Sequence, residues 1–275
     1  MHPLISARRF LLKQLLRTDR SFSLVQTCQR YVDSSRGQNN SDMRTNGELH
    51  VFELTAQLFP NAIIMDVGAN VGDWASAMLS VHKNCRIHCF EPHPATFDHL
   101  RRNLGDQPRA ILHNIGLSDS PGTSTLYNVS IDSGMSSLHR RESALDSHAL
   151  EELPPVSIAL DTVDAFLTRD KVDLVHLLKI DTEGNEPRTL LGAATALAKK
   201  QIRMIQFEYG GTWIDSRSFL LDTWHLLERN GFHVYSIRPD GFRHHQSYHP
   251  QLENFQYSNY LALEAHLAIP ETLRS

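Results

Sequence analysis

The 275-residue sequence lacks several features that would assign a class at once. No stretch approaches the roughly 20 consecutive apolar residues that a membrane-spanning helix needs. The net charge of −4 gives no support to a nucleic-acid partner. Only three cysteines are present (Cys28, Cys85 and Cys89), and their spacing matches no metal site. We expect Cys85 and Cys89 to be small core residues rather than a disulfide, which fits a reducing, cytoplasmic setting.

The first 20 residues combine basic and apolar side chains, and Asp19 is their only acid. The basic residues are Arg8, Arg9, Lys13, Arg17 and Arg20, with leucines, Ile5 and Phe10 between them. This pattern predicts a basic amphipathic helix, without the compact apolar core and cleavage site of a secretory signal. The simpler interpretation is a helix that docks on the domain or on a partner. Peripheral contact with an anionic membrane, or a transit peptide, stays open.

The residues that follow predict a two-part organisation. Residues 33–46 are rich in Ser, Asn, Gly and Arg without periodicity, which predicts a linker. Residues 47–59 resume a helical pattern. We therefore expect an N-terminal helical appendage over residues 1–59 and a main domain over residues 60–275.

The stretch IIMDVGANVGDW, from Ile63 to Trp74, predicts a buried strand that turns through a glycine loop into a helix. Such a unit begins nucleotide-binding α/β folds. The dinucleotide fingerprint G-x-G-x-x-G is missing, and Asp66 and Asp73 flank the loop, where carboxylates repel phosphate. S-adenosylmethionine carries no phosphate but an ammonium and a sulfonium, so the charges favour it over NAD. An alternative in which both acids only cap the helix stays open.

Other apolar segments predict the remaining strands of a largely parallel sheet. The expected strands are residues 86–91, 110–117, 174–180, 203–208, 233–237 and 260–263; the expected helices start at Pro94 and span residues 187–198 and 219–229. Residues 86–91 end in Glu91, at the position where a carboxylate accepts hydrogen bonds from ribose hydroxyls in such folds.

Acidic residues also follow two later strands. Asp181 and Glu183 come directly after residues 174–180, and Glu208 ends residues 203–208. Because ligands gather at the carboxyl ends of such strands, we expect these side chains beside the glycine loop. A strand-end carboxylate can act as a general base, so Asp181 is a predicted catalytic residue, tuned by Lys179 or Glu183. The alternative is that Asp181 and Glu183 only cap the next helix.

A long polar stretch over residues 128–152 predicts a functional or irregular loop, with Ser133–Leu138 as a candidate lid on the acceptor side. Residues 156–160 predict a short strand that can pair with residues 125–127. Asp161 is the expected N-cap of a helix over residues 162–168. Three histidines (His244, His245 and His249) fall in a predicted loop and fit no tight ligand spacing, so no metal site is predicted.

An ordered set of motifs resembles the FkbM-type family of S-adenosylmethionine-dependent methyltransferases. The matching stretches are Asp66–Gly72, Phe90–Pro92, Gly116–Asp119, Ser136–Leu138, Leu160–Thr162 and Leu178–Gly184. The resemblance implies an α/β fold: a Rossmann-like, seven-stranded class I methyltransferase sheet with helices on both faces and an antiparallel last strand. It also implies O-methylation of a hydroxyl on a sugar, glycan or natural product, while the oligomeric state stays open.

The resemblance and the strand-end positions together define the expected site. The predicted catalytic residues are Asp181, Lys179 and Glu183. The predicted cofactor-binding residues are Asp66, Gly68, Ala69, Asn70, Gly72, Asp73, Trp74, Glu91, Pro92, Gly116, Leu117 and Asp119. The predicted substrate-binding residues are Ser136, Ser137 and Glu208. Two other functions stay open: an NAD-dependent oxidoreductase or epimerase on a similar sheet, and a binding module that keeps the fold without chemistry.

Overall fold

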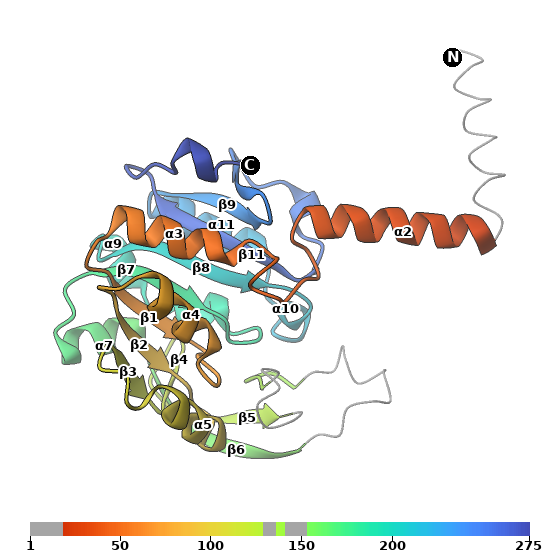
Figure 1. Cartoon of the computed structure of the whole chain (residues 1–275). Helices are drawn as coiled ribbons and strands as arrows, with labels where there is room; N and C mark the ends of the chain where they lie inside the picture. The colour runs from red at the N-terminus through yellow and green to blue at the C-terminus, as the bar shows by residue number, and fades with distance from the viewer. Residues whose placement is uncertain (1–18, 129–135, 141–152) are drawn as a thin grey trace, which may run out of the picture.

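A computed structural model describes residues 19–128, 136–140 and 153–275. Most of the helix expected at residues 1–20, and the first part of the candidate lid (residues 133–135), lie outside the described residues. The first described element is α2 (Asp19–Ser35), which extends away from the main body (Figure 1). None of the helices in these ranges combines the length and apolar content that crossing a bilayer requires.

The main domain is built on an eight-stranded sheet of order β10-β9-β11-β8-β7-β1-β2-β3. Its strands are β1 (Ile63–Val67), β2 (Arg86–Phe90), β3 (Ala110–His113), β7 (Val175–Ile180), β8 (Ile202–Tyr209), β9 (Phe232–Arg238), β10 (Gly241–His245) and β11 (Ser258–Glu264). Neighbours from β8 to β3 pair in parallel, and β11 enters antiparallel between β8 and β9, as expected.

The predicted strand count of seven is wrong by one, because β10 forms where the sequence predicts a loop. The chain turns back after β9 through Pro239-Asp240 and pairs antiparallel with it, with Gly241 opposite Arg238 and His245 opposite Val234. Two of the three histidines, His244 and His245, are therefore on a strand. The α/β fold class itself is confirmed.

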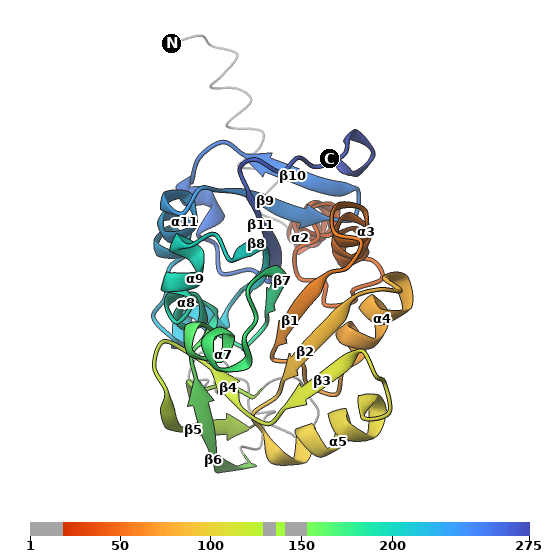
Figure 2. The same ribbon diagram turned by 90° about the vertical axis from the view of Figure 1, so that its left-hand side faces the viewer.

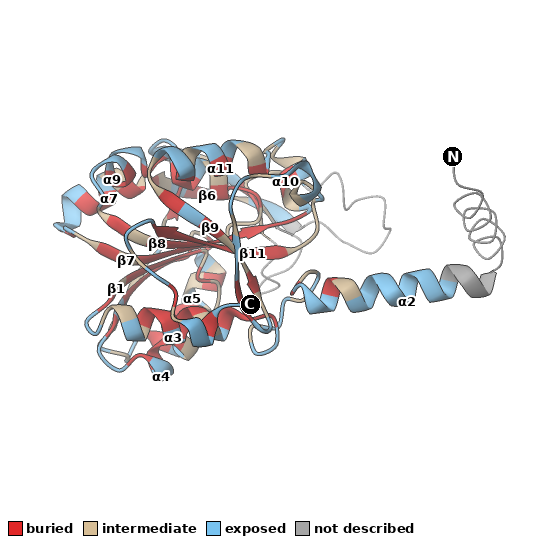
Figure 3. Ribbon diagram, turned by 90° about the horizontal axis from the view of Figure 1, so that it is seen from above, coloured by how far each residue is buried: buried red, intermediate tan, exposed pale blue. Residues whose placement is uncertain are grey.

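Helices cover both faces of the sheet (Figures 2 and 3). One face carries α3 (Glu48–Leu58), α4 (Asp73–Val81) and α5 (Pro94–Leu104); the other carries α7 (Val163–Asp170), α8 (Glu186–Leu191), α9 (Ala194–Ala198) and α11 (Leu220–Arg229). Shorter helices are α10 (Thr212–Asp215), η1 (Pro250–Leu252) and η2 (Glu271–Leu273). Each layer has its own apolar core, centred on Phe52 and Trp74 on the first face and on Phe166 and Trp224 on the second.

A second, three-stranded sheet lies beside the end of the main sheet. It consists of β4 (Gly116–Leu117), β6 (Leu153–Asp161) and β5 (Gly122–Asn128), in that order. The expected pairing of residues 125–127 with 156–160 is confirmed, with Thr125 opposite Ser157 and Leu126 opposite Val156. The single strand expected at residues 110–117 is instead two strands, because the chain leaves the main sheet after His113 and pairs with β6.

Two helix predictions also need correction. The N-cap of α7 is Thr162, not Asp161, since the Thr162 hydroxyl accepts a hydrogen bond from the Ala165 N–H at 3.1 Å. The helix expected over residues 187–198 is divided into α8 and α9. The division occurs at Gly192, whose carbonyl accepts a hydrogen bond from the Asp164 N–H at 3.0 Å and so leaves the helical pattern.

Candidate active site

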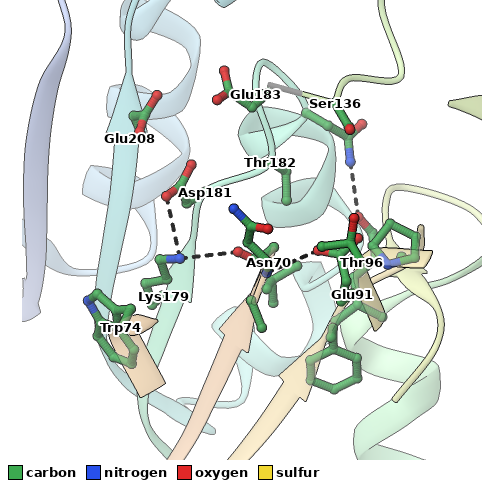
Figure 4. A pocket seen from close by; sticks show the side chains of 18 of the residues that line it. Asn70, Trp74, Glu91, Thr96, Ser136, Lys179, Asp181, Thr182, Glu183 and Glu208 are labelled. Carbon is green, nitrogen blue, oxygen red and sulfur yellow. Dashed lines mark hydrogen bonds and ion pairs between the residues drawn. The ribbon is translucent and has the colours of Figure 1, made fainter. Parts of the chain in front are cut away.

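A cavity of about 380 Å³ opens where β1, β2, β7 and β8 reach their carboxyl ends (Figure 4). This is the edge at which open α/β sheets bind ligands, and the volume is typical of a small-molecule site. Most of the predicted site residues line it: Gly68, Ala69, Asn70, Asp73, Trp74, Glu91, Pro92, Gly116, Leu117, Ser136, Lys179, Asp181, Glu183 and Glu208. The other four (Asp66, Gly72, Asp119 and Ser137) do not.

The glycine loop forms the floor of the cavity between β2 and β7. Gly68 has φ +82°, and a Cβ atom there would stand 1.8 Å from the carbonyl oxygen of Asp181, so only glycine fits. The N–H groups of Gly68 and Ala69 both donate to the Phe90 carbonyl, at 3.0 and 2.9 Å. The loop is therefore fixed against both neighbouring strands, and its main chain is open to a ligand.

Glu91 marks one end of the cavity. Its carboxyl group accepts hydrogen bonds from the backbone N–H groups of Asn70 (3.0 Å) and His93 (2.8 Å), which orient it after β2. Burial raises its pKa to about 7, although the two N–H donors favour the charged form. An apolar slot adjoins it, lined by Pro92, Leu117, Leu126, Ile158 and Leu160. This end suits a flat apolar ring attached to a group with hydroxyls.

Lys179 lies under the middle of the cavity and is almost completely buried. Its ammonium group is 3.0 Å from a carboxylate oxygen of Asp66 and 3.4 Å from one of Asp181, and it donates to the Gly68 carbonyl at 3.4 Å. Burial disfavours its charge, but the two carboxylates outweigh that cost and raise the pKa of Lys179. Lys179 thus stays a cation and cannot act as a base; it holds Asp181 and the glycine loop in position.

Asp66 has no exposed side-chain surface, since its carboxylate faces Lys179 beneath the loop. It cannot contact a ligand in the cavity directly, in contrast to the direct role expected for it. Gly72 likewise lies behind the cavity, as the N-cap of α4.

Carboxyl groups gather at the opposite end from Glu91. The Asp181 side chain is 37% exposed, so a ligand can reach it. Glu208 hydrogen-bonds to Asp181, and burial together with the charges of Asp181 and Glu183 raises the pKa of Glu208 well above its usual value. Glu208 is therefore the proton donor in this pair. Single oxygens of Asp181, Glu183 and Glu208 lie within 4.8 Å of one another, a spacing that a cation could bridge.

The loop after β7 is shaped by Glu186, which the sequence did not single out. Its carboxylate accepts from the N–H groups of Thr182 (2.6 Å) and Gly184 (3.0 Å). The loop's far side is held by Ser137, whose hydroxyl donates to the Glu183 carbonyl at 2.6 Å. Ser137 is thus a loop support, while its neighbour Ser136 lines the cavity. Asp119 lies outside, with a carboxylate oxygen 3.8 Å from Arg188.

Several lining residues are missing from the sequence prediction: Ser41, Met43, Glu48, Thr96, Asn185 and Tyr257. Thr96 and Asn185 follow closely after predicted site residues, whereas the other four come from distant segments. Glu48 had one usable signal, an acid in the first turn of the lead-in helix, but that helix was assigned to the appendage. Tyr257 belongs to the connection before β11, where nothing in the sequence indicated a site.

Comparison with known proteins relates the chain to methyltransferases. A family model for the methyltransferase FkbM domain matches residues 66–234, more than half of the chain. The 2-O-methyltransferase NoeI of Sinorhizobium fredii is 24% identical over 157 residues, covering 54% of this chain and 64% of NoeI. The hexuronic acid methyltransferase AglP of Haloferax volcanii is 26% identical over 149 residues, covering 54% of this chain and 56% of AglP.

Two further matches extend the comparison. Methyltransferase 1 of Beauveria bassiana is 29% identical over 198 residues, covering 66% of this chain and 77% of that protein. The crystal structure of an FkbM methyltransferase from Methylobacillus flagellatus superposes with a TM-score of 0.43 at 16% identity, over 76% of this chain and 47% of that one. The chain spans less than two thirds of the length of NoeI and of AglP.

Proposed function

Because the chain belongs to the FkbM family of methyltransferases, with S-adenosylmethionine as cofactor, we propose that it methylates a hydroxyl group on a sugar, glycan or natural product. The printed names of NoeI and AglP, a 2-O-methyltransferase and a hexuronic acid methyltransferase, support a sugar acceptor. The observation that carries the proposal is the layout of the cavity, with Glu91 and an apolar slot at one end and the accessible carboxylate of Asp181 at the other.

The residues present fit the cofactor. Glu91 is placed to accept hydrogen bonds from the ribose hydroxyls, and the slot lined by Pro92 and Leu160 offers apolar side chains to the adenine ring. The glycine loop passes beneath, with the N–H groups of Gly68 and Ala69 donating to the Phe90 carbonyl and that of Asn70 to Glu91. Asp73, in the first turn of α4, lines the cavity and disfavours NAD, because its carboxylate would repel a pyrophosphate at the helix start.

The chemistry at the other end follows from the carboxyl cluster. Bound S-adenosylmethionine supplies a methyl group made electrophilic by the sulfonium. An acceptor hydroxyl must lose its proton as its oxygen forms the new bond to carbon, and Asp181 is placed to take that proton. Lys179 fixes the position of the Asp181 carboxylate, and Glu208, whose raised pKa favours its protonated form, hydrogen-bonds to Asp181. Alignment of the two reactants and exclusion of water supply the rest of the rate.

Isothermal titration with S-adenosylhomocysteine and with NAD tests the cofactor, and mass-shift screening of hydroxylated sugars then tests the reaction. We expect binding of S-adenosylhomocysteine and a gain of one methyl group on at least one acceptor. Binding of NAD alone would overturn the proposal in favour of an oxidoreductase. Binding without transfer to any acceptor would favour a non-catalytic module.

Peripheral membrane contact through residues 1–20 stays a prediction, and so does a cytoplasmic location.

The affinity for S-adenosylhomocysteine is expected to rise by about three- to tenfold between pH 6 and pH 8. The folded pKa of Glu91, about 7, lies above its usual value of 4.5, so the carboxylate that accepts both ribose hydroxyls forms only as the pH passes through 7. Titration calorimetry across this range measures the effect.

Two variants separate Glu91 from other groups that titrate in this range. Glu91→Gln should weaken binding and remove the pH step. Glu186→Gln removes a second buried carboxyl with a pKa of about 7, and the step should survive there. If the pH step survives in Glu91→Gln or disappears in Glu186→Gln, it belongs to a group other than Glu91.

A further inference from the structure

Glu48 is a buried carboxyl group in the cavity that the mechanism above does not use. It lies in the first turn of α3, before the family-matched residues 66–234, and only 6% of it is exposed. The preceding Gly47 has φ +100°, and a Cβ atom there would stand 2.0 Å from the carbonyl oxygen of Arg238. The helix start is therefore pressed against the end of β9, which fixes where Glu48 enters the cavity.

The contacts of Glu48 orient its carboxylate without neutralising it. One oxygen accepts from the side-chain amides of Asn46 (2.6 Å) and Asn259 (3.4 Å), and the other accepts from Gln206 (2.7 Å). A carboxylate has about four acceptor positions, so one remains on the oxygen that faces Gln206. All three donors are neutral.

The contrast with Asp66 is informative. Asp66 is also buried, but Lys179 lies 3.0 Å from it and balances its charge. Over residues 19–128, 136–140 and 153–275, no lysine, arginine or histidine side chain stands within ion-pair distance of Glu48. Burial raises the pKa of Glu48, while the Asn46 and Gln206 amides and the more distant charge of Lys179 favour the charged form. A buried carboxylate without a cation in direct contact is costly, and a cationic ligand in the cavity would reduce that cost.

The position of Glu48 indicates which part of a ligand would meet it. Glu91 follows β2, whereas Glu48 is held by Gln206 on β8 and Asn259 on β11, so the two carboxyl groups lie on opposite sides of the loop after β1. A nucleoside whose ribose lies at Glu91 and whose ring fills the apolar slot extends its 5′ substituent across that loop, toward Lys179 and Glu48. In S-adenosylmethionine this substituent ends in an amino acid with an ammonium group.

We propose that Glu48 binds the α-ammonium group of the methionine part of the cofactor, a charge that the sequence analysis matched to the carboxylates of Asp66 and Asp73. This inference rests on the proposed function. The ammonium would occupy the remaining acceptor position of the carboxylate and form a charge-assisted hydrogen bond inside the cavity. The lead-in helix α3 is then part of the cofactor site rather than an appendage to it.

A pair of ligands tests this assignment: S-adenosylhomocysteine, which carries the ammonium, and 5′-methylthioadenosine, which has the same nucleoside without the amino acid. In Glu48→Gln we expect affinity for S-adenosylhomocysteine to fall about 10- to 100-fold and affinity for methylthioadenosine to change less than twofold. The control is Glu53→Gln on the exposed side of the same helix, which should bind both ligands as the wild type does.

The outcomes are distinct. Equal losses for both ligands in Glu48→Gln, or no loss for either, overturn the role of Glu48. Failure of the wild-type protein to bind either ligand overturns the proposed function instead. If Glu48→Gln does not fold, as judged by circular dichroism, Glu48→Asp is used, because it keeps the charge but withdraws it by one methylene. Glu48→Asp should lower the affinity for S-adenosylhomocysteine but not the affinity for methylthioadenosine. An equal change in the two affinities also overturns the inference.

Discussion

Replacing Asp181 with asparagine is expected to lower the methyl-transfer rate by about 100- to 10,000-fold, the range that general-base catalysis supplies. Asparagine keeps the shape of the side chain but cannot accept a proton from the acceptor hydroxyl. Because Asp181 lies beyond the glycine loop from Glu91 and the apolar slot, the affinity for S-adenosylhomocysteine should stay within about threefold of the wild type. Single-turnover rates and titration calorimetry measure the two quantities separately.

The matched control is Asp173→Asn, an exposed aspartate just before β7, far from the strand's carboxyl end. Its transfer rate should equal that of the wild type. If Asp181→Asn keeps its turnover and its cofactor affinity, Asp181 is not the base, and the proton must leave by another group. A parallel loss of cofactor affinity would instead show that Asp181 binds the cofactor.

Acidic residues at the cavity could be proposed from the sequence because strand ends are local features. A buried run followed by an acid shows both where a strand stops and that a carboxylate stands at its end, as Glu91 and Asp181 illustrate. Parallel pairing then brings those ends together regardless of the distances along the chain. The glycine loop could also be recognised from the sequence. Position 68 must be glycine because the Asp181 main chain approaches it too closely for a side chain, and such a glycine is visible in the sequence.

The positions of Asp66 and Glu48 could not be predicted, because they depend on the pairing register of the strands and on contacts with distant segments. Asp66 and Lys179 are direct partners across β1 and β7, so they form an ion pair under the loop and Asp66 is withdrawn from the cavity. The residue pattern of one strand does not show which residue of the neighbouring strand lies opposite each position. Glu48 enters from a helix that contacts β8 and β11, which are encoded more than 150 residues later. Only the folded chain shows that α3 belongs to the site.

The buried pair of Lys179 and Asp66 leads to the largest expected change in stability. Lys179→Met should lower the free energy of unfolding by about 3–5 kcal/mol, because methionine fills a similar volume but leaves the fully buried carboxylate of Asp66 without its cation. Urea denaturation followed by circular dichroism measures the loss. The variant should also bind S-adenosylhomocysteine more weakly, because Lys179 no longer holds the Gly68 carbonyl.

A double-mutant cycle with Asp66→Asn distinguishes this ion pair from simple packing. Each single variant leaves one charge or one polar group unmatched, whereas the double variant Asp66→Asn with Lys179→Met removes both charges and should be more stable than Lys179→Met alone. A double variant whose losses are simply additive would show that the two side chains do not depend on each other. Recovered stability without recovered turnover would place the role of the pair in catalysis, since Asp181 still lacks the cation that orients it. The buried charges of Lys179 and Asp66 would then serve to position the exposed carboxylate of Asp181.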